Sequence, residues 1–388
     1  MSGPLDGLVV VEIGRYIAAP YAGRLLADLG ADVIKVEEPD GGDPMRRWEG
    51  GDRPYSPQFA AYNRSKRSVA LDLKDPAGAA ALRDLLATAD VLLENFRPGV
   101  MARLGLDPAD LVADNPRLVA CSITGFGAEG EYAARPSYDT VISAMGGLYS
   151  LLMPIEDPSP VGPGMSDLLS GMFAVQGVLA ALHERSTSGR GQVVDVTMLG
   201  SVLGFLTEAV TTTIETGEEQ LPDTRQRRAQ AYGCVDSDGL AFVVHLSVPD
   251  KFWHALTDAL DHPEWRDDAR FADRQGRYTH YVELERLIKD ATRTRTRAEW
   301  FDRFRERDLP HGPMNTVGQV VDDPQVAAMG LLEDVDIPGG PPMRMTTPAA
   351  AFSRTPTAAG RAAPTLGVDT DSVLHADQGG VPHAHTRS

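Results

Sequence analysis

Cysteine is scarce in this sequence, because only Cys121 and Cys234 occur among its 388 residues. Each lies inside an apolar segment, without Cys-x-x-Cys spacing and without a neighbouring histidine. This pattern excludes a disulfide framework and offers no set of ligands at zinc-binding spacing. We therefore expect both cysteines in the hydrophobic core, no bound metal, and a reducing compartment, the cytoplasm.

Long apolar runs are also missing. No stretch approaches the roughly 18 to 20 uninterrupted apolar residues that a membrane-spanning helix needs. The first six residues have neither the basic region nor the apolar region of a secretory signal. We expect a protein that is not exported and has no membrane partner.

Positive charge is in deficit. The chain has 37 lysines and arginines against 55 aspartates and glutamates, a net charge of −18, which would repel a polyanion. Nucleic acid is therefore not an expected partner. Basic residues are nevertheless gathered between positions 46 and 103: Arg46, Arg47, Arg53, Arg64, Lys66, Arg67, Arg97 and Arg103. We interpret this basic island as a site for one small anionic ligand, with ordinary solvated charges as the alternative.

Short β-branched runs alternate with helix-like segments over the first 200 residues. Strands are expected at 8–13, 33–36, 69–73, 91–93, 117–121 and 193–197. Helices are expected at 17–30, 76–90 and 168–184, the last apolar nearly all round and so buried. This alternation predicts an α/β, Rossmann-like large domain with a mostly parallel sheet. No Gly-x-Gly-x-x-Gly turn follows the first strand, so a conventional NAD or FAD site has no support.

The pattern changes after about residue 200. A polar, charged segment is followed by a hairpin signal at Asp238-Gly239 and by helical spacing at 249–260 and 297–307, which predicts a smaller α+β domain. The predicted boundaries are the N-terminal part of the large domain at 1–214, a linker at 215–230, the small domain at 231–318, a return segment completing the large domain at 319–376, and a disordered tail at 377–388.

Several short motifs occur in a distinctive order. They are Ala27–Glu37 (ADLGADVIKVE), Asn63–Ser68 (NRSKRS), Glu94–Gly99 (ENFRPG), Gly125–Gly127 (GFG), Pro136–Asp139 (PSYD), Ser166–Leu168 (SDL) and Thr187–Gln192 (TSGRGQ). Together they resemble the family III CoA-transferases, a group that includes formyl-CoA transferase, carnitine CoA-transferase and, as a divergent branch, α-methylacyl-CoA racemase. The likeness covers almost the whole chain and implies transfer of CoA between carboxylic acids.

Asp167 stands where those transferases carry their nucleophilic aspartate. It follows a glycine-rich loop and begins a helix, where backbone N–H groups and the helix dipole favour an ionised carboxylate. The resemblance implies that this carboxylate attacks a thioester, giving an anhydride and then an aspartyl-CoA thioester. A plain helix N-cap is the alternative role for Asp167. Asp139 is the other candidate carboxylate but lacks that setting.

The resemblance also implies that the large domain binds the CoA thioester as a substrate, with no tightly bound cofactor. The matching positions are Tyr16, Ile17, Leu71, Asn95, Phe96, Arg97, Arg103, Leu104 and Tyr138. Core packing is the alternative for Phe96 and Leu104. Formyl-CoA transferase has an arginine near the nucleotide where this chain has Glu38, and Arg46 or Arg47 is expected to substitute.

Two other functions are weighed against the transferase. The racemase branch needs a histidine where this chain has Tyr138 and a glutamate where it has Pro249, so racemase chemistry is disfavoured. The second alternative is a non-catalytic CoA-binding protein. The expected partners are an acyl-CoA, a carboxylic acid and, by resemblance, a second copy of the chain in an interlocked homodimer. The sequence leaves the acids open, and it leaves His245 either lining the acyl pocket or packed in the core.

Overall fold

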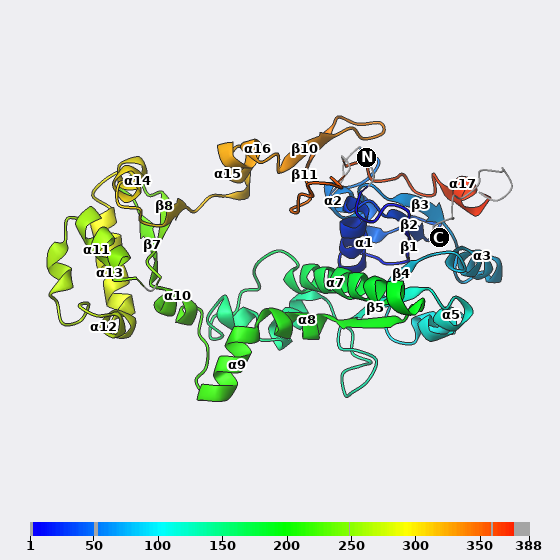
Figure 1. Ribbon diagram of the computed structural model, residues 1–388, viewed down its shortest axis with the longest axis horizontal. Helices are drawn as coiled ribbons and strands as arrows, with labels where there is room; N and C mark the ends of the chain where they lie inside the picture. The colour runs from blue at the N-terminus through cyan, green and yellow to red at the C-terminus, as the bar shows by residue number, and fades with distance from the viewer. Residues whose placement is uncertain (1–2, 50–52, 248, 358–359, 376–388) are drawn as a thin grey trace. The chain divides into compact units, whose positions relative to one another are not determined.

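The computed structural model describes residues 3–49, 53–247, 249–357 and 360–375, and it divides into two compact units (Figure 1). The large unit comprises Met1–Tyr149, Pro160–Glu215 and Gln325–Ser388. The small unit comprises Ser150–Ser159 and Thr216–Pro324. The predicted domain boundaries stay predictions, and the predicted disordered tail at 377–388 lies outside the described residues.

A six-stranded parallel sheet with the order β3-β2-β1-β4-β5-β6 forms the centre of the large unit. Its strands are β1 (Val9–Glu12), β2 (Asp32–Glu37), β3 (Arg67–Ala70), β4 (Val91–Glu94), β5 (Val119–Thr124) and β6 (Val193–Thr197). The predicted α/β fold with a mostly parallel sheet is confirmed. From β1 the chain builds the sheet first toward β3 and then, from β4, in the opposite direction. In open α/β sheets such a reversal marks where ligands bind, outside the carboxyl ends of the strands.

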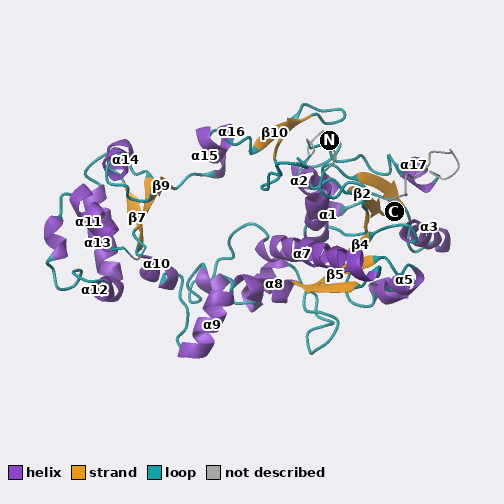
Figure 2. Cartoon of the chain, in the orientation of Figure 1, coloured by secondary structure: helices purple, strands orange, loops and turns teal. Residues whose placement is uncertain are grey.

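Helices cover both faces of this sheet (Figure 2). They are α1 (Ala18–Asp28), α2 (Pro57–Asn63), α3 (Pro76–Leu86), α4 (Val100–Arg103), α5 (Pro108–Asp114), α6 (Asp139–Met145), α7 (Met165–Ser188) and α8 (Met198–Phe205). On one face Val11 and Ile13 pack with Leu82 and Leu86 of α3 and with Leu111 of α5. The alternating side chains, such as Val10, are buried on the other face, where α1 and α7 lie. Because the sheet is buried on both faces, most side chains of its inner strands are apolar, and the charged ones are buried near the carboxyl ends of β1, β2 and β4.

Helices α1 and α7 approach each other closely. A methyl group at Gly171 of α7 would lie 2.9 Å from the carbonyl oxygen of Ala18, so only glycine allows this contact. The far side of α7 is less covered than the sequence indicated, because Met172 is 53% exposed, and the prediction of burial all round is wrong for this chain. Within the described residues, α7 is also the one helix whose length and composition would suit a membrane span.

The remaining elements of the large unit are η1 (Pro44–Arg47), α9 (Thr207–Thr216), α16 (Pro324–Ala328), the antiparallel pair β10 (Leu332–Val335) and β11 (Met343–Thr346), and α17 (Thr370–Leu374). The short η2 (Tyr149–Leu151) begins at the last residue of a large-unit segment and continues into the small unit. Val335 and Met345 of this pair pack with Phe59 of α2, so the return segment closes over the N-terminal half of the unit.

The small unit has an antiparallel sheet of β7 (Ala231–Val235), β8 (Ala241–His245) and β9 (His311–Pro313). Its helices are α10 (Thr224–Ala229), α11 (Asp250–Ala259), η3 (Pro263–Arg266), α12 (Arg274–Thr279), α13 (Tyr281–Thr292), α14 (Arg297–Arg305) and α15 (Val317–Val321). Trp253, Trp300 and Phe304 form its core with Cys234. The predicted hairpin and small α+β domain are confirmed, as is the burial of both cysteines. His245 lies half-buried at the end of β8, opposite Ala231.

Candidate active site

The loop after β1 is held in an unusual backbone conformation. Tyr16 has φ of 64°, in the left-handed region that a bulky residue rarely adopts. Its N–H donates to the carboxylate of Asp43 at 3.2 Å, and Lys35 donates to the carbonyl oxygen of Gly14 at 2.8 Å. The amide of Asn95 accepts from the N–H of Arg15 and donates to its carbonyl oxygen, both at 2.9 Å. Three side chains from β2, η1 and the end of β4 therefore fix this loop.

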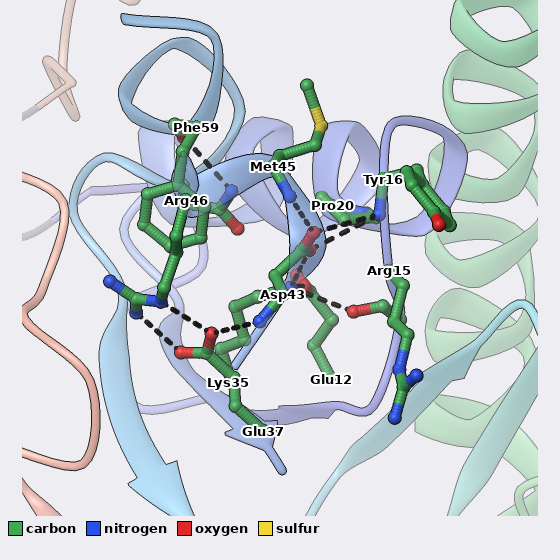
Figure 3. Close-up of polar contacts among 12 residues, drawn as sticks. Glu12, Arg15, Tyr16, Pro20, Lys35, Glu37, Asp43, Met45, Arg46 and Phe59 are labelled. Carbon is green, nitrogen blue, oxygen red and sulfur yellow. Dashed lines mark hydrogen bonds and ion pairs between the residues drawn. The ribbon is translucent and has the colours of Figure 1, made fainter. Parts of the chain in front are cut away.

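Beneath the loop lies a cluster of six buried charges, three positive and three negative (Figure 3). Lys35 contacts Glu12 at 2.9 Å and Asp43 at 3.1 Å, and Lys66 contacts the other oxygen of Glu12 at 2.6 Å. Arg46 forms a two-pronged pair with Glu37 at 2.6 and 2.8 Å. We call these six residues the buried charge cluster: Glu12, Lys35, Glu37, Asp43, Arg46 and Lys66.

Protonation in this cluster follows its contacts. Burial lowers the pKa of Lys66 to about 8, against the opposing effect of Glu12. Burial also tends to lower the pKa of Lys35. The negative charges of Glu12, Asp43 and Glu37 together outweigh burial and raise the pKa of that ammonium group. Although burial opposes it, the hydrogen bonds from Arg46 and the charge of Lys35 lower the pKa of Glu37 to about 2. Lys35, which holds the Tyr16 loop through the carbonyl oxygen of Gly14, is thus kept ionised by its carboxylate neighbours.

Among the cavities that open at the carboxyl ends of the strands in the large unit, two contain Arg15 in their lining. The first, here the Leu71 cavity, is lined by Ile13, Glu37, Leu71, Lys74 and Leu104 among others. The second, here the Asp167 cavity, is lined by Tyr16, Asn95, Arg97, Arg135, Tyr138 and Asp167 among others. Arg15 and Phe96 line both, so the two cavities adjoin along these side chains. One extended ligand therefore has room to occupy both.

Asp167 lies in the first turn of α7, two residues after the first helical position, and the N-cap of that helix is Gly164. The alternative of a plain N-cap is therefore wrong. The expectation of a stabilised carboxylate is also wrong, because burial first, and the charge of Asp139 second, raise the pKa of Asp167 to about 7. A group with that pKa holds its proton below neutral pH and becomes a nucleophile near it.

Asp139 is a direct neighbour of Asp167 that the sequence did not indicate. One of its oxygens, Oδ1, accepts from the Ser166 N–H at 2.7 Å, from the Ser166 hydroxyl at 2.8 Å and from the Asp167 N–H at 3.4 Å. Asp139, rather than Asp167, thus satisfies backbone donors at the start of α7. The two carboxyl groups are 28 residues apart in sequence, and only the tertiary fold brings them together.

The sequence-predicted CoA residues fall into three places. Leu71, Phe96 and Leu104 line the Leu71 cavity, while Tyr16, Asn95, Phe96, Arg97 and Tyr138 line the Asp167 cavity. The rings of Tyr16 and Tyr138 meet edge-on at 6.5 Å. Ile17 belongs to the apolar cluster that includes Met45 and Phe59, and Arg103 lies on an exposed surface hollow beside Leu104. Their roles in binding CoA stay predictions.

Three of the eight residues of the basic island are internal. Arg46, Arg64 and Lys66 are buried in ion pairs with Glu37, Asp28 and Glu12 respectively. The interpretation of the whole island as one anion site is therefore wrong. Of the two residues expected to substitute for the missing arginine near the nucleotide, Arg46 is excluded, because Glu37 and the carbonyl oxygen of Pro364 occupy its guanidinium. The role of Arg47 stays a prediction.

Comparison with known proteins identifies the chain. The profile described as CoA-transferase family III matches residues 5–370. The chain belongs to CoA-transferase family III. It is 34% identical to "Succinate--glutarate CoA-transferase" of Agrobacterium fabrum, over 96% of this chain and 95% of that one. It is also 34% identical to "Succinyl-CoA--D-citramalate CoA-transferase" of Chloroflexus aurantiacus, over 94% and 91%. The crystal structure of a CAIB/BAIF family protein from Brucella suis superposes with a TM-score of 0.84 at 33% identity, covering 96% of this chain and 99% of that one.

The prediction of a CoA-transferase is confirmed by these matches, and its substrates are of the acyl-CoA and carboxylate classes. The racemase and the non-catalytic alternatives find no support in them. Within the described part of this family III CoA-transferase, no three His, Cys, Asp or Glu side chains are grouped as metal ligands.

Replacing Asp139 with asparagine in this CoA-transferase should move its pH–rate profile to lower pH. The amide removes the negative charge that helps to raise the pKa of Asp167, yet its Oδ1 still accepts from Ser166. On the prediction that the ionised Asp167 carboxylate is the nucleophile, the wild-type rate should rise with pH through about 7, and the variant should complete that rise earlier.

The measurement is the rate of CoA transfer between about pH 5 and pH 9. Asp195→Asn is the control, because this carboxylate on β6 does not line the Asp167 cavity and should leave the midpoint in place. An unchanged or raised midpoint in Asp139→Asn would contradict the assignment.

Proposed function

We propose that this family III CoA-transferase moves CoA between dicarboxylic acids by covalent catalysis on Asp167. The observation that carries the mechanism is the position of Asp167: it lines a cavity that adjoins the Leu71 cavity, and its pKa is raised to about 7. The Leu71 cavity, with apolar walls and Lys74 at its edge, receives the nucleotide end of CoA. The Asp167 cavity receives the thioester.

The chemistry runs in four displacements at carbonyl carbons. The Asp167 carboxylate attacks the donor thioester, the C–S bond breaks, and an acyl-aspartyl anhydride and CoA thiolate form. The thiolate attacks the aspartyl carbonyl, which releases the donor acid and leaves an aspartyl-CoA thioester. The acceptor carboxylate then attacks this thioester, giving a second anhydride and thiolate. Attack of the thiolate on the acceptor carbonyl yields the new acyl-CoA and regenerates Asp167.

The dicarboxylic substrate class is supported by the relatives, whose names specify succinate, glutarate and D-citramalate. The cytoplasmic location and the homodimer stay predictions.

Mass spectrometry of the intact and digested protein tests this mechanism. After incubation with succinyl-CoA and no acceptor, a CoA or succinyl adduct should appear on the peptide that contains Asp167, and it should be absent from Asp167→Ala. Transfer of CoA to glutarate by a wild type that carries no such adduct, or an adduct on another residue, would contradict it. Incorporation of solvent deuterium next to the thioester carbonyl, without acceptor, would favour the racemase alternative instead.

A further inference from the structure

A dicarboxylic acyl group brings a second negative charge into a cavity that already contains acid groups. Asp167 lines this cavity and Asp139 lies beside Asp167, so an incoming carboxylate would be repelled by whichever of them is ionised. Binding such a group therefore needs a cation in the same cavity. Three arginines line the Asp167 cavity: Arg15, Arg97 and Arg135.

The three arginines are placed differently. Arg15 forms an ion pair with Glu38 at 3.3 Å and also lines the Leu71 cavity, so it lies where the two cavities adjoin. Arg97 lines the Asp167 cavity and a third cavity that contains Glu94 and Asp195, but it does not line the Leu71 cavity. Arg135 lines the Asp167 cavity but not the Leu71 cavity. In the part of the chain that the structure describes, no carboxylate lies within ion-pair distance of Arg135.

Aromatic rings hold the guanidinium of Arg135 in place. It lies 4.7 Å from the ring centre of Tyr132 and 6.0 Å from that of Phe126, and these two rings pack edge to face at 5.6 Å. Stacking leaves the edge of the guanidinium, which carries its N–H donors, open for a carboxylate. The rings therefore orient the cation without neutralising it.

The segment that carries Arg135 is fixed relative to Asp167. A methyl group at Gly125, just after β5, would lie 2.0 Å from the hydroxyl oxygen of Ser137, so this segment packs directly on the end of the sheet. Asp139 in turn accepts from the N–H of Asp167 at 3.4 Å. Arg135 is four residues from Asp139, so their Cα atoms are at most about 14 Å apart. An extended arginine side chain and a short diacid attached to Asp167 can together span that distance.

We propose that Arg135 binds the distal carboxylate of a dicarboxylic acyl group and is the specificity-determining residue that favours dicarboxylic over monocarboxylic acyl-CoA. This inference rests on the proposed function, because it assumes that the acyl group reacts at Asp167. The guanidinium offers two parallel N–H donors that match a carboxylate, while Tyr16 and Tyr138 provide the rest of the wall.

The test compares succinyl-CoA with butyryl-CoA, which has the same chain length but ends in a methyl group. The second-order rate constant for adduct formation on Asp167, without acceptor, is measured for each ester in wild type, Arg135→Met, Arg135→Lys and Arg97→Met. A charged hydrogen-bonded pair contributes enough binding free energy that its loss in Arg135→Met should lower the succinyl-to-butyryl ratio of rate constants roughly 10- to 100-fold. Arg135→Lys should recover part of this ratio. Arg97→Met should slow both esters alike.

The outcomes are distinct. An unchanged ratio in Arg135→Met, or a wild type that prefers butyryl-CoA, overturns the role of Arg135 while leaving Asp167 chemistry intact. A fall in the succinyl-to-butyryl ratio for Arg97→Met, and not for Arg135→Met, assigns the distal carboxylate to Arg97. That result also overturns the role of Arg135. If the wild type forms no adduct with either ester, the proposed function fails, and the inference that rests on it fails too.

Discussion

Replacing Asp167 with alanine should lower kcat for CoA transfer by about four orders of magnitude or more, because the step that breaks the thioester loses its nucleophile. Asp139 is beside it, with one oxygen occupied by the Ser166 N–H and hydroxyl. The measurement is the steady-state rate of glutaryl-CoA formation from succinyl-CoA and glutarate. A variant that keeps more than a tenth of the wild-type kcat would rule out covalent catalysis at this residue.

The stability of an Asp167→Asn variant separates loss of chemistry from loss of folding. Because burial and Asp139 raise the pKa of Asp167 to about 7, its ionised form is less favourable in the folded chain than in the unfolded one. The folded state therefore loses stability as pH rises from about 4 through 7, and the amide, which is always neutral, avoids this loss. The variant should melt at or above the wild-type temperature at pH 8. A lower melting temperature would mean that the carboxylate stabilises the fold.

The sheet was predictable from the sequence because its signals are local. β1, β2 and β6 contain short β-branched runs, and the order of runs and helices specifies a parallel sheet. β3 (Arg67–Ala70) has the weakest signal, and it begins two residues before the predicted 69–73. Asp167 was likewise found from a local motif. Asp139 was named only as a second candidate carboxylate. Its contact with the start of α7 was not predicted, because that contact depends on how α6 and α7 pack, which spacing does not reveal.

The basic island shows the opposite case, in which a local signal is misleading. Composition counts Arg64 and Lys66 as available charges, yet their partners Asp28 and Glu12 lie 36 and 54 residues away along the chain. Likewise, GFGAEG at 125–130 has the spacing of a dinucleotide turn, but it follows β5 and leads into turns, not into a helix. A charge or a glycine pattern indicates a site only after the fold has placed it.

Replacing Glu12 with glutamine should destabilise the large unit by about 3–5 kcal/mol, the cost of removing one partner from a buried ion pair. Glu12 is fully buried and is the only side chain of the buried charge cluster that contacts both lysines, at 2.9 Å to Lys35 and 2.6 Å to Lys66. Glutamine keeps the shape, so the loss is one of charge. A larger side chain at neighbouring Gly23 could not compensate for the lost charge, because a methyl group there would lie 2.0 Å from the carboxylate of Glu12.

The pH dependence of this loss identifies its cause. Burial already lowers the pKa of Lys66 to about 8, and removing Glu12 lowers it further. A lysine with a depressed folded pKa costs stability as pH falls toward that value, so Glu12→Gln should differ from wild type more at pH 7 than at pH 9. Urea unfolding at pH 7 and at pH 9 measures the free energy of unfolding, and hydrogen exchange in β1 and β2 peptides measures the stability of these strands. Asp114→Asn, which removes the partner of the exposed Arg83, is the control and should change stability by no more than about 1 kcal/mol. If Glu12→Gln changes it as little as this control, the charges of the cluster do not hold the strands, and the Tyr16 loop is held by its backbone hydrogen bonds alone.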